Sequence, residues 1–94
     1  MKTIYKYPLE PVSEQTYAMP KGAKILSVQW IRGQVCIYAL VDTDEKTYES
    51  HQFLIIGTGH LIRPNTEPAV HYFLGTVHNE DQSLVFHIFE KKEQ

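Results

Sequence analysis

The sequence predicts an all-β domain, a small antiparallel sandwich or open barrel of about six or seven short strands. Three observations indicate this class. Several runs alternate apolar and polar residues with period two, turn residues separate these runs, and no segment sustains a helical period. The chain has 94 residues, which allows one domain. We expect a single β domain over residues 1–90 and a polar tail at 91–94.

The first two expected strands, Thr3–Tyr7 and Gln15–Met19, are bounded by prolines. Pro8 and Pro11 interrupt the first of them. The segment Met19-Pro20-Lys21-Gly22 predicts a turn after the second, because a residue before proline is pushed towards extended geometry and glycine accepts positive φ.

A hairpin is expected next. Leu26, Val28 and Trp30 recur with period two and are predicted to lie on one face of a strand over Ala23–Ile31. Arg32-Gly33 then makes a tight connection, with Gly33 in the left-handed region or in a glycine bulge.

The following strand, Gln34–Val41, is apolar on both of its faces. A strand buried on both sides is unusual in a lone antiparallel sheet, so we expect a second layer or another subunit to cover it. A chain of this length buries only about 60–65% of the surface exposed by its unfolded form, which makes its core thin. Both arguments predict self-association into a homo-oligomer.

The C-terminal half repeats the pattern of strands and turns. Asp42–Lys46 is a charged loop, Gly57-Thr58-Gly59-His60 breaks a strand, and His60–Pro68 contains two prolines and is expected to be a loop. The remaining strands are expected at Thr47–Ile56, Ala69–Val77 and Leu84–Phe89, the last two forming a hairpin.

Composition excludes several classes of protein. The formal net charge of -2 gives no basic face for long nucleic acids. No apolar run approaches the ~18–20 residues of a membrane-spanning helix, so no membrane partner is expected. The N-terminus lacks the pattern of a secretory signal, and the single cysteine, Cys36, cannot form an internal disulfide. We therefore expect a cytoplasmic protein in which Cys36 is a buried apolar residue.

Gly57-Thr58-Gly59-His60, with Arg63 shortly after it, is the sharpest local feature. Two glycines let backbone N–H groups approach an anion, Thr58 adds a hydroxyl, and His60 and Arg63 add donors suited to phosphate or carboxylate. The segment matches neither the dinucleotide fingerprint nor a P-loop. A strand-ending turn without a ligand is the alternative interpretation.

Aromatic residues, among them Trp30 and Tyr38, could form a stacking surface for a nucleobase-like ring, the alternative being core and interface packing. The five histidines lack the spacing of a zinc site, so we expect no metal and no cofactor. No catalytic constellation is recognisable, and the chain is expected not to be an enzyme.

Five segments of the chain are distinctive when taken together, namely Met1–Tyr7, Met19–Gln29, Gly57–His60, Tyr72–Val77 and Leu84–Glu90. In this order they resemble an uncharacterised family of small proteins encoded by bacteriophages and prophages. The resemblance covers nearly the whole chain and implies a phage accessory protein made in the cytoplasm of a bacterial host.

In that context we expect a non-enzymatic counter-defence protein that binds and sequesters a small anionic, nucleotide-like ligand. The expected contacts are Gly57, Thr58, Gly59, His60, Arg63, Trp30 and Tyr38. Two alternatives stay open. One is a protein–protein inhibitor or adaptor that acts on a host defence protein through an apolar patch or a free sheet edge, which the two apolar faces of Gln34–Val41 suggest. The other is a virion or assembly component.

Overall fold

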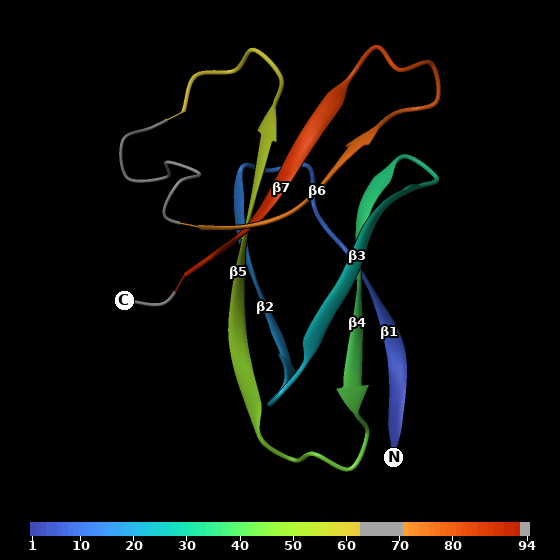
Figure 1. The fold of residues 1–94 in the computed structure, drawn as a ribbon, viewed down its shortest axis with the longest axis vertical. Coiled ribbons are helices and arrows are strands. Elements are labelled where there is room, and N and C mark those ends of the chain that lie inside the picture. The colour runs from blue at the N-terminus through green and yellow to red at the C-terminus, as the bar shows by residue number, and fades with distance from the viewer. Residues whose placement is uncertain (63–70, 93–94) are drawn as a thin grey trace.

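The computed structural model describes residues 1–62 and 71–92 and contains seven antiparallel strands (Figure 1). Each of them overlaps one of the seven segments expected from the sequence, and the all-β class is confirmed. The final strand runs through Lys91, one residue into the segment expected to be a tail. The strands are β1 (Lys2–Pro8), β2 (Glu14–Pro20), β3 (Lys24–Ile31), β4 (Gln34–Asp42), β5 (Tyr48–Gly57), β6 (His71–His78) and β7 (Val85–Lys91).

The strands form two sheets that face each other as a sandwich and do not close into a barrel. The three-stranded sheet has the order β1-β4-β3, and the four-stranded sheet has the order β2-β5-β7-β6. Only the hairpins β3–β4 and β6–β7 join strands that are neighbours in the chain. The connection between β1 and β2 passes from one sheet to the other (Figure 1).

The β3–β4 hairpin turns in two residues, because Ile31 pairs with Gln34. Arg32 and Gly33 have φ values of 48° and 85°, so both residues of the turn are left-handed, as a tight hairpin requires. The predicted left-handed Gly33 is confirmed.

A β-bulge in β3 corrects one expectation. Leu26 was expected on the face of Val28 and Trp30, but the register shifts between Ile25 and Ser27. The extra residue reverses the alternation at that point, so that Ile25 packs against the core and the side chain of Leu26 is 46% exposed.

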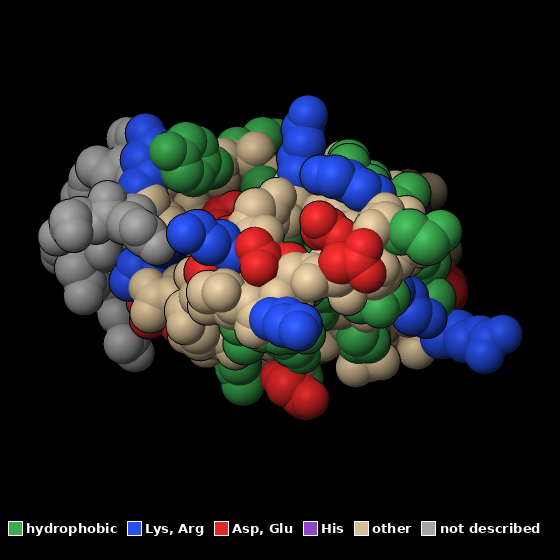
Figure 2. Space-filling model, turned by 90° about the horizontal axis from the view of Figure 1, so that it is seen from below, with side chains coloured by type: hydrophobic (Ala, Val, Ile, Leu, Met, Phe, Trp, Pro, Cys, Tyr) green, Lys and Arg blue, Asp and Glu red, His purple; other side chains and the backbone are tan. Residues whose placement is uncertain are grey.

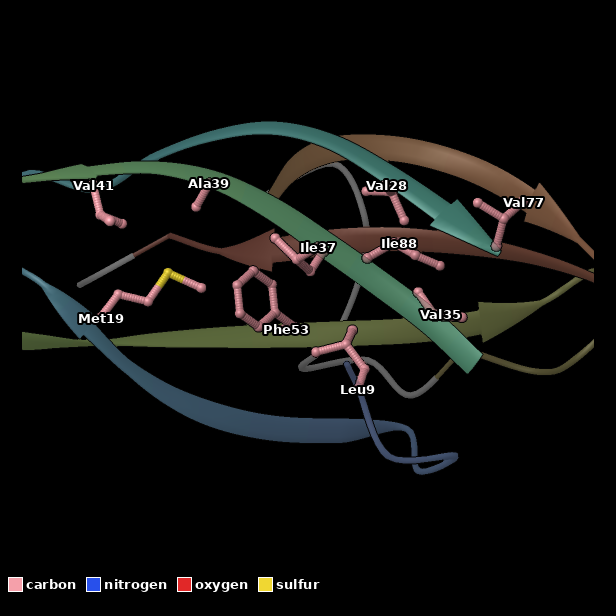
Figure 3. Close-up of a cluster of buried hydrophobic side chains, with 10 residues drawn as sticks. All are labelled: Leu9, Met19, Val28, Val35, Ile37, Ala39, Val41, Phe53, Val77 and Ile88. Atoms are coloured by element: carbon pink, nitrogen blue, oxygen red, sulfur yellow. The ribbon is translucent and has the colours of Figure 1, made fainter. Parts of the chain in front are cut away.

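The core fills the space between the two sheets (Figure 3). Phe53 from β5, Ile88 from β7 and Ile37 from β4 are completely buried there. Burial of one such side chain is worth about 1.5–3 kcal/mol, so these three positions carry a large part of the stability of a small domain.

The two apolar faces of β4 have different surroundings. Val35, Ile37, Ala39 and Val41 belong to the core, which means that the second layer expected from the sequence is the four-stranded sheet. The alternating residues, of which Tyr38 is one, lie on the outer face of the three-stranded sheet. The expected self-association stays a prediction.

Cys36 also lies on this outer face, yet it is only 2% exposed, as expected for a buried apolar residue. Burial raises the pKa of its thiol above the ordinary value.

The part of the chain that the structure describes contains no helix long and apolar enough to cross a membrane.

Candidate functional site

An open pocket of about 370 Å³ lies at the end of the sandwich where the β3–β4 hairpin meets the end of β5. Its lining is mostly apolar and includes Leu9, Trp30, Gly57, His60 and Phe86. These residues come from four separate parts of the chain, and we call this the Trp30 pocket. It continues the hydrophobic core, because Leu9 is 2% exposed and belongs to the core cluster.

Trp30 forms one wall of the pocket. Its indole is stacked on the ring of Phe86, with centroids 6.0 Å apart and planes 12° from parallel. Its Nε1–H donates to Oε1 of Glu80, at 3.1 Å, in the loop between β6 and β7. Both contacts come from the β6–β7 hairpin, so they tie Trp30 of the three-stranded sheet to the opposite sheet and give the wall a defined orientation.

The Gly57–His60 segment forms a tight turn at the rim of the pocket. The backbone N–H of His60 donates to the carbonyl of Gly57 at 3.0 Å, and Gly59 has a φ of 85°, which favours glycine. The His60 imidazole lies against Gly57, where a Cβ atom would stand 2.7 Å from two of the ring atoms. Gly57 is therefore required for the position of His60 in the pocket.

The hydroxyl of Thr58 is engaged within the protein. It lies 2.8 Å from Nε2 of His87, and the hydroxyl of Thr76 lies 3.0 Å from Nδ1 of the same ring. A hydroxyl can donate or accept, so the two threonines satisfy both ring nitrogens in either tautomer. We call this arrangement the His87 clamp, and it fastens the turn after β5 to β6 and β7.

The backbone of the turn is also partly engaged. Thr58 N–H donates to the carbonyl of Val85 at 3.0 Å, and His60 N–H donates within the turn. Two of the N–H groups that an anion-binding loop would use are therefore hydrogen-bonded inside the protein. Among the described residues, Glu10 and His60 are the ionisable side chains that line the pocket.

The structure brings together three of the residues expected to bind a ligand: Trp30, Gly57 and His60 line one pocket. Thr58 and Gly59 lie at the adjoining turn and are exposed. Tyr38 lies elsewhere, on the outer face of the three-stranded sheet. Arg63 lies outside the described residues.

Trp30 and Tyr38 are separated because side chains alternate between the two faces along each strand of the β3–β4 hairpin. Trp30 pairs with Val35 and so shares the inward face of Val35, whereas Tyr38 is three residues further along β4 and points to the opposite face. A two-residue turn at Arg32-Gly33 would have predicted this from the sequence.

Three residues of the site were not among the contacts expected from the sequence. Phe86 alternates with Ile88 on the inward face of β7, and this period-two signal could have identified it as inward-facing. Leu9, between two prolines, gave no strand signal. Glu80 is in a loop, 50 residues from Trp30, and carries no local signal for its bond to the indole.

A polar cluster lies in the first half of β5, before Phe53 in the chain. His51 has Nδ1 2.5 Å from Oε2 of Glu90 and Nε2 3.3 Å from Oε1 of Glu49, and its side chain is 12% exposed. Glu49 also accepts the backbone N–H of Gly22 at 3.0 Å. Within residues 1–62 and 71–92, no set of three His, Cys, Asp or Glu side chains is placed to hold a metal ion.

Comparison with known proteins gives one match. The model of a domain of unknown function, DUF7352, matches residues 1–94 of the chain. No curated protein and no solved structure matches the chain. The expected resemblance to an uncharacterised family is confirmed, and the phage origin of that family stays a prediction.

Proposed function

Because the chain belongs to the DUF7352 family, a family of unknown function, we propose its function from the pocket itself. The protein is a non-enzymatic binding protein that captures a small nucleotide-like ligand, with the planar ring of the ligand in the Trp30 pocket. One observation carries this proposal: Trp30 of β3 and Gly57 and His60 of the turn after β5, two segments far apart in the chain, line a single concave and mostly apolar surface.

The size and chemistry of the pocket suit such a ligand. Small-molecule pockets enclose about 300–1,000 Å³, and the Trp30 pocket has about 370 Å³. Contact of a nucleobase with an aromatic side chain is worth about 1–3 kcal/mol. His60 can donate to an anionic group at the rim, and the carboxylate of Glu10 can accept from an amino group of the ring.

The biological role we propose is sequestration. The resemblance to phage proteins motivates a counter-defence protein that acts in the cytoplasm of a bacterial host and removes a nucleotide-type signal by binding it. Sequestration needs a pocket and a stable scaffold, and it needs no catalytic group. In a host with a nucleotide-signalling defence system, expression of the protein should restore phage plating, and His60→Ala should abolish that effect.

The single tryptophan of the chain makes binding directly measurable, because the fluorescence of Trp30 reports on the pocket alone. We would titrate the protein with cyclic nucleotides and ADP-ribose derivatives and analyse the purified protein by mass spectrometry for ligand bound in the cell. A true ligand quenches or shifts the emission and raises Tm, with stabilisation of about 2.7 kcal/mol at a hundredfold excess over Kd.

His60→Ala should weaken binding at least about tenfold, a loss of about 1.4 kcal/mol. Tyr38→Ala is the matched control, since Tyr38 lies on the other face of its sheet, and it should leave binding unchanged. No fluorescence change and no Tm shift across the panel, together with no copurified ligand, would contradict the proposed function.

A further inference from the structure

The outer face of the three-stranded sheet carries an apolar strip that the core does not use. Ile4 of β1 pairs with Leu40 of β4, and Tyr38 lies two residues before Leu40 on the same face. Leu26, turned away from the core by the bulge, adds to this face from β3. Ile4 is 55% exposed and Leu26 46% exposed, so the strip is open to solvent.

Lysines flank this strip. Lys6 pairs with Tyr38, and Lys24 pairs with Leu40, so each lies beside an apolar residue of the strip. Lys2 lies on the same face, opposite Asp42. None of these lysines forms an ion pair with a described residue.

The charge of this face is opposite in sign to that of the whole chain. Its strand positions carry three lysines and one carboxylate, Asp42, whereas the formal net charge of the chain is -2. Charges of both signs lie side by side on the end of the molecule seen in Figure 2. The strand positions of the outer face of the three-stranded sheet thus combine a basic rim with an exposed apolar strip.

We propose that this face docks an acidic, amphipathic segment of another protein, whose apolar side chains cover Ile4, Leu26 and Leu40 and whose carboxylates meet Lys6 and Lys24. Exposed apolar patches with a polar rim mark interaction surfaces, and complementary charge selects the partner. A small anion would leave the apolar strip uncovered, so it does not account for this surface.

A second copy of the chain is a poorer occupant. In a twofold dimer the same patch is present on both partners. Face-to-face pairing would place two faces of the same net positive charge against each other, and juxtaposed like charges oppose association. The charge of the face thus favours an acidic partner over self-association through this surface.

The proposal is tested with the full chain and two synthetic ten-residue peptides labelled with fluorescein. One peptide alternates glutamate and leucine, and the other alternates lysine and leucine, so that they share the same apolar residues and carry opposite charges. Fluorescence anisotropy at low salt should show binding of the acidic peptide at least about tenfold tighter than of the basic one, with the preference decreasing as salt screens the charges.

Variants locate the binding surface. Lys6→Glu/Lys24→Glu should reverse the preference between the two peptides, and Leu26→Ser should weaken binding of the acidic one. Lys46→Glu, in the loop after β4, and Leu84→Ser, an exposed leucine before β7, are the matched controls and should change nothing. Circular dichroism checks that each variant keeps its strands.

Four outcomes would overturn the proposal. They are equal binding of the two peptides, binding that the charge reversal leaves unchanged, binding to vesicles with 30% phosphatidylserine but to neither peptide, and a dimer in light scattering that Leu26→Ser dissociates. None of these depends on the Trp30 pocket, so the proposed ligand-binding function is tested separately.

Discussion

The imidazole of His60 rests directly on the backbone of Gly57: a methyl group at Gly57 would stand 2.7 Å from both Cε1 and Nδ1 of the ring. The contact joins the last residue of β5 to the rim of the Trp30 pocket. It gives Gly57 a steric role that is distinct from the conformational role of Gly59, whose φ is 85°.

Gly57→Ala should therefore displace the His60 ring. We expect a loss of about 1 kcal/mol in the free energy of unfolding, because His60 is exposed and can rotate away. In a His60→Ala background the same substitution should cost nothing, and a double-mutant cycle from urea unfolding measures this coupling. Gly75→Ala is the control, since its new Cβ would meet Val28 at an ordinary 3.6 Å. Additive effects of Gly57→Ala and His60→Ala would contradict the steric account.

The His87 clamp predicts coupling between two threonines. Thr58→Val and Thr76→Val keep the side-chain volume but remove a hydroxyl from His87, and each should cost about 1 kcal/mol. Their combination should differ from the sum by about 0.5 kcal/mol or more, because both hydroxyls hold one ring. Thr16→Val, an exposed β2 position, should stay within about 0.5 kcal/mol of the parent. Strict additivity in chemical denaturation would argue against a shared clamp.

Cys36 should report on opening of the three-stranded sheet. Its thiol is buried and its pKa is raised by that burial, so little thiolate is accessible in the native protein. We expect reaction with Ellman's reagent at pH 8 to be slower than in guanidinium by about a hundredfold or more, which corresponds to an opening free energy of about 3 kcal/mol. A Cys36→Ser/Thr16→Cys variant supplies the exposed control. Equal rates in native and denatured protein would show that Cys36 is accessible.

Glu49 makes stability depend on pH in the acid range. The backbone N–H of Gly22 donates to this carboxylate, and that bond lowers its pKa below the ordinary 4.5. The unfolded chain then binds the proton more readily than the folded one. The contribution of the ionised Glu49 to the free energy of unfolding is therefore complete above pH 4.5 and is lost as pH falls through the lower pKa of the folded state. In urea unfolding between pH 6 and pH 3, Glu49→Gln should reduce the pH dependence, while Glu14→Gln should not. An unchanged slope in Glu49→Gln would contradict this role.

The strands could be predicted from the sequence because the patterns that indicate them are local. Period-two alternation, prolines at the ends of β1 and β2, and the Arg32-Gly33 turn each depend on neighbouring residues. The bulge at Leu26 could not be predicted in this way, because it depends on how β3 aligns with β4. That one extra residue exposes Leu26, which thereby becomes part of the apolar strip on the outer face of the three-stranded sheet.

The candidate site was predictable only in part. The glycines and His60 stood out as a turn, and Trp30 as an aromatic residue, but nothing local placed them together. The Trp30–Glu80 bond spans 50 residues, and the pocket also needs Leu9 from the connection between the sheets. Such contacts depend on the packing of whole strands.

By itself the sequence determined an all-β chain of about six or seven strands, a buried Cys36 and a glycine turn before His60, since steric preferences and side-chain alternation act over a few residues. Only the tertiary structure decided that β1 pairs with β4 and β2 with β5. It also decided that Trp30, Gly57 and His60 line one pocket. Strand pairing joins segments far apart in the chain, and the burial of one face selects the register.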